Sequence, residues 1–364
     1  MNERIIARNK QVVIGADVHQ KKHVVTAMTP DGEYCHKAKH LSPNKGAWIA
    51  YLAKFPGCAV QVVYEAGPQG YNLHDWLVSI REKEGFDVIA VIAPPAMVAK
   101  APGKKAIKTD KRDSAGLIKA WLKKDFVPVV VPDKAKRQER QVVRTRKFFK
   151  EQEVSLKNSV RSLLTFQGIP EPEGIVFSER WTQKARKAVE ENDITGGRLL
   201  QVFEAILSAY LSVEESIKIL KKEMKKIIEN GECGEVARRL KELVGIGDIA
   251  AATIATEVAD FRAFRNSEAF ASYVGVVPGE YSSGERERKG HITRVGNSRL
   301  RSIFVECAWV WLQHDPEAKR IYSRIKAGKE KRKFIAIVAL ARKLAVKVYH
   351  KALNNPPPLG VAAT

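Results

Sequence analysis

The sequence predicts an α/β domain at the amino terminus, a helical arm in the middle and a mainly helical region at the carboxyl terminus. Short apolar runs of strand length alternate with helical patterns over residues 11–125. Apolar residues then follow coiled-coil spacings over residues 134–229, and helical spacings return beyond residue 235. The expected domains are 1–130, 131–232 and 233–355, followed by a tail at 356–364.

The amino-terminal domain is expected to alternate strands and helices after an initial group of strands. Apolar runs bounded by turn residues predict the strands, and apolar residues three and four apart predict the helices. The strands are expected at 12–17, 23–28, 33–39, 59–65 and 88–92, and the helices at 44–54, 71–81 and from about residue 109. Three antiparallel strands followed by alternating helices and strands is the element order of an RNase H-like domain.

Four carboxylates of this domain occupy positions where they could converge. Asp17 and Glu65 each end an apolar strand, while Asp110 and Asp113 lie three residues apart at the start of a helix and so share a helix face. Clustered carboxylates repel one another without a cation, so we expect bound Mg²⁺ or Mn²⁺. Two such ions roughly 4 Å apart could hold the attacking and leaving oxygens of a phosphodiester. Alternatively, Asp110 and Asp113 only stabilise a helix amino terminus and Asp17 only shapes a turn.

The middle segment has the pattern of two long helices. In the first, Val142, Phe149, Leu156 and Leu163 recur every seven residues. In the second, apolar residues alternate spacings of three and four, which is a coiled-coil seam. Its members are Phe203, Ile206, Tyr210, Val213, Ile217, Leu220, Met224 and Ile227. The sequence allows either a hairpin within one chain or dimerisation through this arm.

The carboxyl-terminal region contains a glycine turn, a loop and a closing helix. The turn at Gly245 and Gly247 resembles that of a helix-hairpin-helix, which presents backbone N–H groups to a phosphate; an ordinary helix–helix turn is the alternative. Residues 278–284 are expected to form a loop before a charged run. The closing helix is expected at Lys331–Lys351, with inward residues Phe334, Ile337, Val338, Ala341, Leu344 and Val348.

The loop contains a candidate nucleophile in the segment Tyr281-Ser282-Ser283-Gly284. A serine hydroxyl between a tight turn and a basic run could attack a phosphate if a metal or base activates it. Nearby arginines and lysines could neutralise the phosphate oxygens. Tyr281 is a rival nucleophile, and a serine that only shapes a turn is the structural alternative.

The net charge of the chain indicates a polyanionic partner. It carries 63 Lys and Arg against 41 Asp and Glu, a net charge of +22 with pI ≈ 9.8. Such a field favours nucleic acid, although a basic surface that is merely solvated would have the same composition. The candidate contact residues are Lys104, Lys105, Lys108, Arg112, Gly245, Gly247, Arg286, Arg288, Lys289, Arg294, Arg299 and Arg301.

The composition also limits the compartment. The four cysteines are widely spaced, without a Cys-x-x-Cys pair, which argues against zinc ribbons and fits a reducing cytoplasm. The amino terminus lacks an apolar signal core, and no apolar stretch is long enough to cross a bilayer. We therefore expect a soluble, cytoplasmic protein that does not contact a membrane.

The four acids, the helical arm and the serine loop, followed by Gly296-Asn297-Ser298-Arg299-Leu300-Arg301, occur in an order that resembles the DEDD insertion-sequence transposases guided by a bridge RNA. The resemblance covers nearly the whole chain and implies a prokaryotic, nucleoid-associated protein. It implies a RuvC-like domain in which Asp17, Glu65, Asp110 and Asp113 bind metal.

The resemblance also implies a carboxyl-terminal transposase domain with a nucleophilic serine directly before a glycine, which is Ser283 in this sequence, with Ser282 beside it. Ser283 would form a covalent phosphoserine with DNA, while a structured RNA would pair with donor and target DNA. The family further implies a homo-oligomer, a dimer or a dimer of dimers, in which the two catalytic regions meet between protomers.

Two other functions remain open on the sequence. A hydrolytic RuvC- or RNase H-like nuclease would use the four acids and water, leaving Ser283 without a role. A non-catalytic, basic nucleic-acid-binding protein would use its acids only to cap helices.

Overall fold

The computed structural model describes residues 10–67, 69–95, 110–283, 286–292 and 296–354. It divides into two compact units, Met1–Val131 and Pro132–Thr364, which are described separately. The expected tail, together with Lys104, Lys105, Lys108, Gly284 and Arg294, lies outside the described residues.

The first unit contains a mixed five-stranded sheet in the order β3-β2-β1-β4-β5. β1 pairs antiparallel with β2 and parallel with β4, and β4 pairs parallel with β5. Its elements are β1 (Gln11–Val18), β2 (His23–Met28), β3 (Tyr34–Leu41), α2 (Lys45–Leu52), β4 (Ala59–Glu65), α3 (Asn72–Glu84), β5 (Val88–Ala93) and α4 (Asp110–Leu122). This arrangement is consistent with the RNase H-like fold expected from the sequence.

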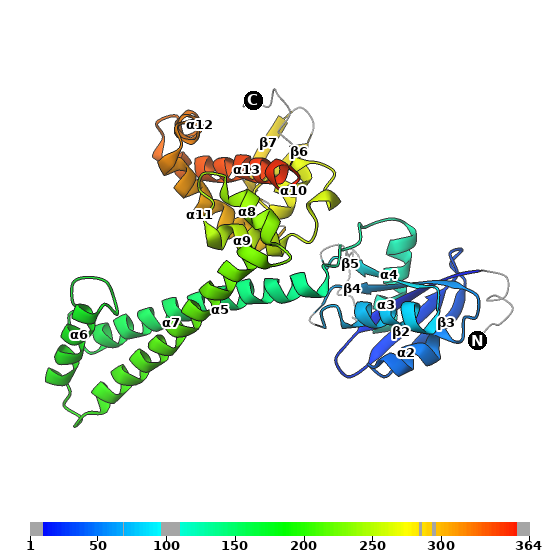
Figure 1. Ribbon diagram of the computed structural model, residues 1–364, viewed down its shortest axis with the longest axis horizontal. Helices are drawn as coiled ribbons and strands as arrows, with labels where there is room; N and C mark the ends of the chain where they lie inside the picture. Colours follow the sequence, from blue (N-terminus) through cyan, green and yellow to red (C-terminus); the bar gives the residue numbers. More distant parts are fainter. Residues whose placement is uncertain (1–9, 68, 96–109, 284–285, 293–295, 355–364) are drawn as a thin grey trace. The chain divides into compact units, whose positions relative to one another are not determined.

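Helices cover both faces of this sheet (Figure 1). Side chains alternate along a strand, so Ile14 and Val62 pack with α2 and α3, while Val13 and Val63 pack with α4. The core on the α2 and α3 face includes Trp48, Tyr51, Leu73, Leu77 and Ile80. The central strands β1, β2 and β4 are therefore largely buried on both faces, whereas the edge strand β3 is polar and only partly buried.

The first turns of α4 approach β1 so closely that only glycine fits at position 15. A Cβ on Gly15 would lie 1.9 Å from the carbonyl oxygen of Ser114. The Ser114 hydroxyl is 2.8 Å from the Thr26 hydroxyl of β2, and both side chains are buried. Trp121, near the other end of α4, donates to Gln61 of β4 over 2.6 Å. These contacts fix the position of α4 across β1, β2 and β4.

We expect Gly15→Ala to destabilise the first unit by about 3 kcal/mol, because the added methyl group must displace the backbone of α4. Gly116→Ala is the matched control, since Gly116 lies in the same helix with nothing within 4 Å of the added Cβ. That control should stabilise by about 0.5–1 kcal/mol. Urea unfolding of the two variants measures the difference. A Gly15→Ala protein as stable as the parent chain would contradict the contact between α4 and β1.

The second unit begins with two long helices, α5 (Lys134–Phe166) and α7 (Arg198–Asn230), which lie side by side in Figure 1. Val143 of α5 packs in one cluster with Met224 and Ile227 of α7, and Val160 packs in another with Phe203. The helices are therefore antiparallel. The short helix α6 (Glu179–Glu191) lies between them in sequence, and its Trp181 is buried in the cluster around Val160.

In α7 the predicted seam residues Phe203, Tyr210, Ile217, Met224 and Ile227 are buried. The other three, Ile206, Val213 and Leu220, are half-buried, whereas Leu207 and Ile228 are buried, so a coiled-coil seam stays a prediction. In α5 the heptad residues Val142, Phe149, Leu156 and Leu163 are only half-buried, and Val143, Glu153, Val160 and Leu164 are buried instead. The seven-residue repeat predicted a contact face of α5 that begins one residue before the buried one. The half-buried apolar residues that border the contact recur with the same spacing as the buried residues. A packed pair within one chain is thus present, and dimerisation through the arm stays a prediction.

The remaining elements form a helical core with a two-stranded hairpin. They are α8 (Gly234–Lys241), α9 (Asp248–Glu257), η1 (Phe261–Ala263), α10 (Ser267–Val274), β6 (Pro278–Ser283), β7 (Arg286–Ile292), α11 (Ser298–His314), α12 (Pro316–Lys326), η2 (Glu330–Arg332) and α13 (Lys333–Ala352). The core of this region combines α9, α11 and α13, where Ile254, Phe304 and Leu344 are at most 1% exposed.

Two expectations for this region were wrong. Residues 278–283 form β6, which pairs antiparallel with β7, and not a loop. The charged sequence lacks apolar alternation, so the pairing depends on backbone hydrogen bonds that the side-chain pattern does not reveal. Phe334 was expected to point inward, but it is 73% exposed, because the buried stripe of α13 starts one turn later at Ala336 and Ile337.

Candidate active site

Asp17 and Glu65 lie at the carboxyl ends of neighbouring parallel strands. The paired register of β1 and β4 ends with Ala16 opposite Tyr64, so the two acids directly follow the last pair. Ala16 and Tyr64 pack with the α2 and α3 face. Because side chains alternate, Asp17 and Glu65 belong to the opposite face, which α4 covers. Two of the four predicted carboxylates therefore share one edge and one face of the sheet.

The orientation of α4 directs its amino terminus toward the same edge. Ser114 lies against Gly15, whereas Trp121 contacts Gln61, which is opposite Val13, so α4 runs antiparallel to β1. Asp17 is two strand residues beyond Gly15, a rise of about 7 Å. Asp110 is four helix residues before Ser114, a rise of about 6 Å in the same direction. The backbone of the first turn of α4, with Asp110 and Asp113, therefore reaches the level of Asp17.

The side chains that the structure describes at this edge fit a hard cation. The Asp17 carboxylate is 19% exposed and lies 3.1 Å from Nε2 of the exposed His19, while Glu65 is exposed. All four candidate ligands are carboxylates, the donors preferred by Mg²⁺ and Mn²⁺. Among the described residues no group of three or more His, Cys, Asp or Glu side chains gathers as a metal site; the side chains of Asp110 and Asp113 are not among them. The complete ligand set thus stays a prediction.

Ser283 is the last residue of β6 and pairs with Arg286 of β7. Ser282 pairs with Glu287, and Tyr281 pairs with Arg288. The candidate nucleophile is therefore at the end of a β-hairpin, beside the residues that connect its strands, and Arg286, Arg288 and Lys289 follow on the neighbouring strand.

The segment that leads from this hairpin into α11 is held by a buried anchor. Gly296 has φ +105, and a Cβ there would lie 2.4 Å from the Tyr273 carbonyl oxygen. The next residue, Asn297, donates its backbone N–H to the same carbonyl over 2.8 Å and caps α11 with its side chain. Its amide also donates to Glu257 over 3.1 Å. The exit of the hairpin segment is thereby fixed to α9 and α10.

Glu257 connects this anchor to α5. Its side chain is 1% exposed and accepts two hydrogen bonds from Arg144, from Nε at 2.7 Å and from Nη2 at 2.8 Å. One and two turns earlier on the same face of α5, Arg140 and Lys136 donate to the carbonyls of Thr256 and Ala259. Three cationic side chains, spaced four residues apart on α5, thus bind acceptors at and just after the carboxyl end of α9, where the helix dipole is negative.

Burial alone would raise the pKa of Glu257, but the hydrogen bonds and charge of Arg144, aided by Asn297 and Arg140, outweigh it and hold the pKa below its usual 4.5. A carboxylate with a lowered pKa in the folded state contributes stability that is complete above its ordinary pKa and is lost as pH falls through the lower, folded value.

We expect Glu257→Gln to cost about 2 kcal/mol of unfolding free energy at neutral pH, because two hydrogen bonds to a charged group are weakened. The difference from the parent chain should stay constant above about pH 4.5 and shrink below it as Glu257 becomes protonated. Urea unfolding at several pH values measures this. The exposed Glu229→Gln is the matched control, and a difference that grew on acidification would contradict the role of the ion pair.

The predicted nucleic-acid residues have different surroundings. Gly245 has φ +93, and a Cβ there would lie 2.8 Å from the carbonyl oxygen of Cys307, so its packing against α11 explains this glycine. Gly247 precedes α9 and has open space around it. Arg299 is exposed, while Nη1 of Arg301 is buried without a hydrogen-bond partner. Arg112, Arg286, Arg288 and Lys289 are located by backbone only. Phosphate binding by any of these residues stays a prediction.

Sequence reasoning missed the residues that position the candidate site. The contact between Gly15 and Ser114 joins positions far apart in sequence, so no local pattern signals it. The stripe of Lys136, Arg140 and Arg144 did have a signal, a spacing of four residues on one helix face.

Of the helices that the structure describes, none is long and apolar enough to span a membrane.

Two family models match the chain, one in a region that includes the four acids and one in a region that includes the serine hairpin. A model described as a DEDD transposase of the IS110 type matches residues 14–168, which include the four acids. A model described as a transposase of the IS116/IS110/IS902 family matches residues 237–323, which include Ser283 and its hairpin.

Curated relatives align over most of the chain. A putative transposase of Sinorhizobium fredii, y4qE, is 27% identical over 328 residues, covering 89% of this chain and 77% of the relative. A second, y4rJ, is 26% identical over 369 residues, covering 93% and 91%. The transposase for insertion sequence element IS1111A of Coxiella burnetii is 24% identical and covers 58% of this chain and 57% of its own length.

Proposed function

We propose that the chain, whose similarity to transposases of the DEDD, IS110 type indicates a DNA transposase, is an RNA-guided recombinase that exchanges DNA strands through a covalent phosphoserine. The observation that carries this proposal is the geometry of the first unit. Asp17 and Glu65 end adjacent parallel strands on the face covered by α4, and the contact between Ser114 and Gly15 brings the first turn of α4 to their level.

Divalent metal dependence is a general property of the DEDD transposase family. Asp17, Glu65, Asp110 and Asp113 are the residues that would hold Mg²⁺ or Mn²⁺. When bound, the metal supplies positive charge that stabilises the phosphorane-like transition state and eases loss of the serine proton. Asp17 and Glu65 lie at the ends of strands that are buried on both faces, which limits their movement, and Asp110 and Asp113 belong to the first turn of α4.

Ser283 is the proposed nucleophile. Its hydroxyl loses a proton, Oγ bonds to phosphorus, and the bond from phosphorus to one sugar oxygen breaks, which releases a sugar hydroxyl. The phosphodiester energy is kept in the phosphoserine, so a second sugar hydroxyl can reverse the step on another strand. Arg286 and Arg288 follow on β7 and supply cationic groups suited to phosphate oxygens. Support comes from the position of Ser283 at the end of β6 and from the family match around it.

Sequence choice would come from a structured guide RNA that pairs with donor and target DNA. The net charge of +22 supports simultaneous binding of the RNA and the two DNA molecules, which are all polyanions. We propose a homo-oligomer, a dimer or a dimer of dimers, in which Ser283 of one protomer acts together with the four acids of another protomer.

A strand-transfer assay with the cognate RNA, donor DNA and target DNA tests the proposal. We expect recombinant product only when the RNA and Mg²⁺ are both present, and loss of product on chelation with EDTA. Hydrolysed DNA ends without joined product would instead support a RuvC-like nuclease, and binding without any cleavage would support a non-catalytic protein.

A further inference from the structure

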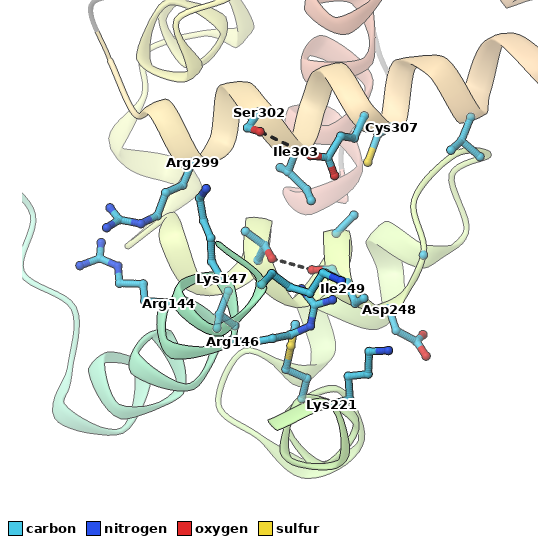
Figure 2. Close-up of a pocket in the computed structure, with 18 of the residues that line it drawn as sticks. Arg144, Arg146, Lys147, Lys221, Asp248, Ile249, Arg299, Ser302, Ile303 and Cys307 are labelled. Atoms are coloured by element: carbon cyan, nitrogen blue, oxygen red, sulfur yellow. Dashed lines mark hydrogen bonds between the residues drawn. The ribbon is translucent and has the colours of Figure 1, made fainter. Parts of the chain in front are cut away.

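A cavity of about 880 Å³ lies within the second unit, between α5, α7, α9 and α11. Seven cationic side chains and three carboxylates line it. Figure 2 shows Arg144, Lys147 and Arg299 together at one side of the cavity, with Ile249, Ile303 and Cys307 nearer its centre and Lys221 on the α7 side. The cavity therefore combines a cationic rim with an apolar floor.

Part of this charge is already neutralised within the chain. Arg144 is paired with Glu257, and Lys147 is paired with Glu151 at 2.6 Å. The Asp248 carboxylate is paired with Lys241 at 2.6 Å, outside the cavity lining. In the part of the chain that the structure describes, four lining cations have no ion-pair partner: Arg146, Lys221, Lys225 and Arg299. The surplus positive charge thus comes from three different helices.

Arg146 contributes to this surplus from α5, where Glu153 and the lining carboxylate Glu306 attract it. Its Nε atom is buried and has no hydrogen-bond partner. An unsatisfied guanidinium N–H costs free energy, which an anion recovers if the side chain turns toward the cavity. A guanidinium also matches the geometry of phosphate oxygens.

The floor requires a ligand that also has an apolar surface. Ile249 and Ile303 are only half-buried, and Val154 and Val310 are 54% and 43% exposed, so a free phosphate would leave this aliphatic lining in contact with water. A nucleotide has both parts, since its base presents a flat, poorly hydrated face and its phosphate is anionic. The cavity volume is within the range of small-ligand sites, about 300–1,000 Å³, which admits one or a few nucleotides. In a duplex the base faces are stacked on one another and unavailable.

We propose that this cavity binds an unpaired nucleotide of a single-stranded nucleic-acid segment, with the base on the aliphatic floor and the phosphates on Arg146, Lys221, Lys225 and Arg299. The inference rests on the proposed function only for the class of ligand, nucleic acid. It requires neither the acidic cluster nor Ser283.

The test measures binding of three fluorescent DNA probes to the full-length protein by anisotropy, without divalent metal. The probes are a short single strand, the same strand with abasic sites in place of its bases, and the corresponding duplex. We expect the single strand to bind about tenfold more tightly than the abasic strand, since burial of about 55 Å² of base surface at about 25 cal/mol per Å² corresponds to a factor of about ten.

The variants remove two rim cations from α7. Lys221→Ala with Lys225→Ala should weaken binding of the intact strand and lower the slope of log affinity against log salt by about 1.4, or about 0.7 for each lost phosphate contact. Lys222→Ala with Lys226→Ala is the matched control, because it removes the same charge from the same helix outside this cavity. It should leave both the affinity for this strand and the slope unchanged.

Equal binding of the intact and abasic strands would overturn the proposal, as would tighter binding of the duplex or an equal loss in both double variants. Failure of the proposed function is separately visible. Ser283→Ala should bind the single strand as tightly as the parent chain does. If Ser283→Ala still recombined DNA, the proposed function would fail, but the measured preference for the intact strand would be unaffected.

Discussion

Ser283→Ala should abolish strand transfer, with a loss on the order of 10⁴-fold or more, because removal of a nucleophile eliminates the covalent step. Product formation in the RNA-dependent strand-transfer assay measures it. Ser283 is the last residue of β6, and its neighbours in the hairpin are paired through their backbones, so loss of one hydroxyl should leave the hairpin folded.

Ser282→Ala is the matched control for this result. It removes the same atom from the adjacent residue of the same strand, and we expect it to keep most of the activity. Full transfer by Ser283→Ala would refute the covalent-serine mechanism. Loss in Ser282→Ala with activity retained in Ser283→Ala would move the nucleophile by one residue, and Tyr281→Phe tests the remaining candidate.

Asp17→Asn should reduce strand transfer by about 10³-fold, because loss of one ligand charge removes several kcal/mol of transition-state stabilisation. The substitution preserves the shape of a side chain that is only 19% exposed, so the sheet should remain intact. Rates at increasing Mg²⁺ or Mn²⁺ concentrations, together with the affinity for DNA, measure the effect. Affinity for DNA should be nearly unchanged, since Asp17 is proposed to bind metal.

Asp31→Asn provides the control in the same unit, because Asp31 is an exposed acid in the turn between β2 and β3. It should transfer strands at the parent rate. Equal activity of Asp17→Asn and the parent chain at limiting metal concentration would contradict a metal role for Asp17.

The sheet and the strand-end acids were largely predictable from sequence. β2 and β4 were predicted with their observed bounds because turn residues or charged side chains interrupt the apolar runs at both ends. Asp17 and Glu65 interrupt two such runs, and parallel pairing of β1 with β4 then makes them neighbours. The local pattern was sufficient to predict this pair of acids, because the carboxyl ends of neighbouring parallel strands lie side by side for any length of the connecting segment.

Contacts between distant segments were not predictable in the same way. The sequence around Gly15 does not reveal that the backbone of Ser114 packs against it and excludes any side chain there. The β6–β7 hairpin has a charged sequence, so backbone pairing replaces the apolar alternation that sequence reasoning depends on. The cavity in the second unit takes residues from α5, α7, α9 and α11, and no single helix carries its pattern.

The covalent intermediate provides the most direct test of the account. Stopping the reaction early in denaturant and mapping the protein–DNA adduct by peptide mass spectrometry identifies the linked residue. We expect a DNA phosphate on Ser283 in the parent chain and on no residue in Asp17→Asn. An adduct on Tyr281 or Ser282, or recombinant product formed without any adduct, would contradict the mechanism.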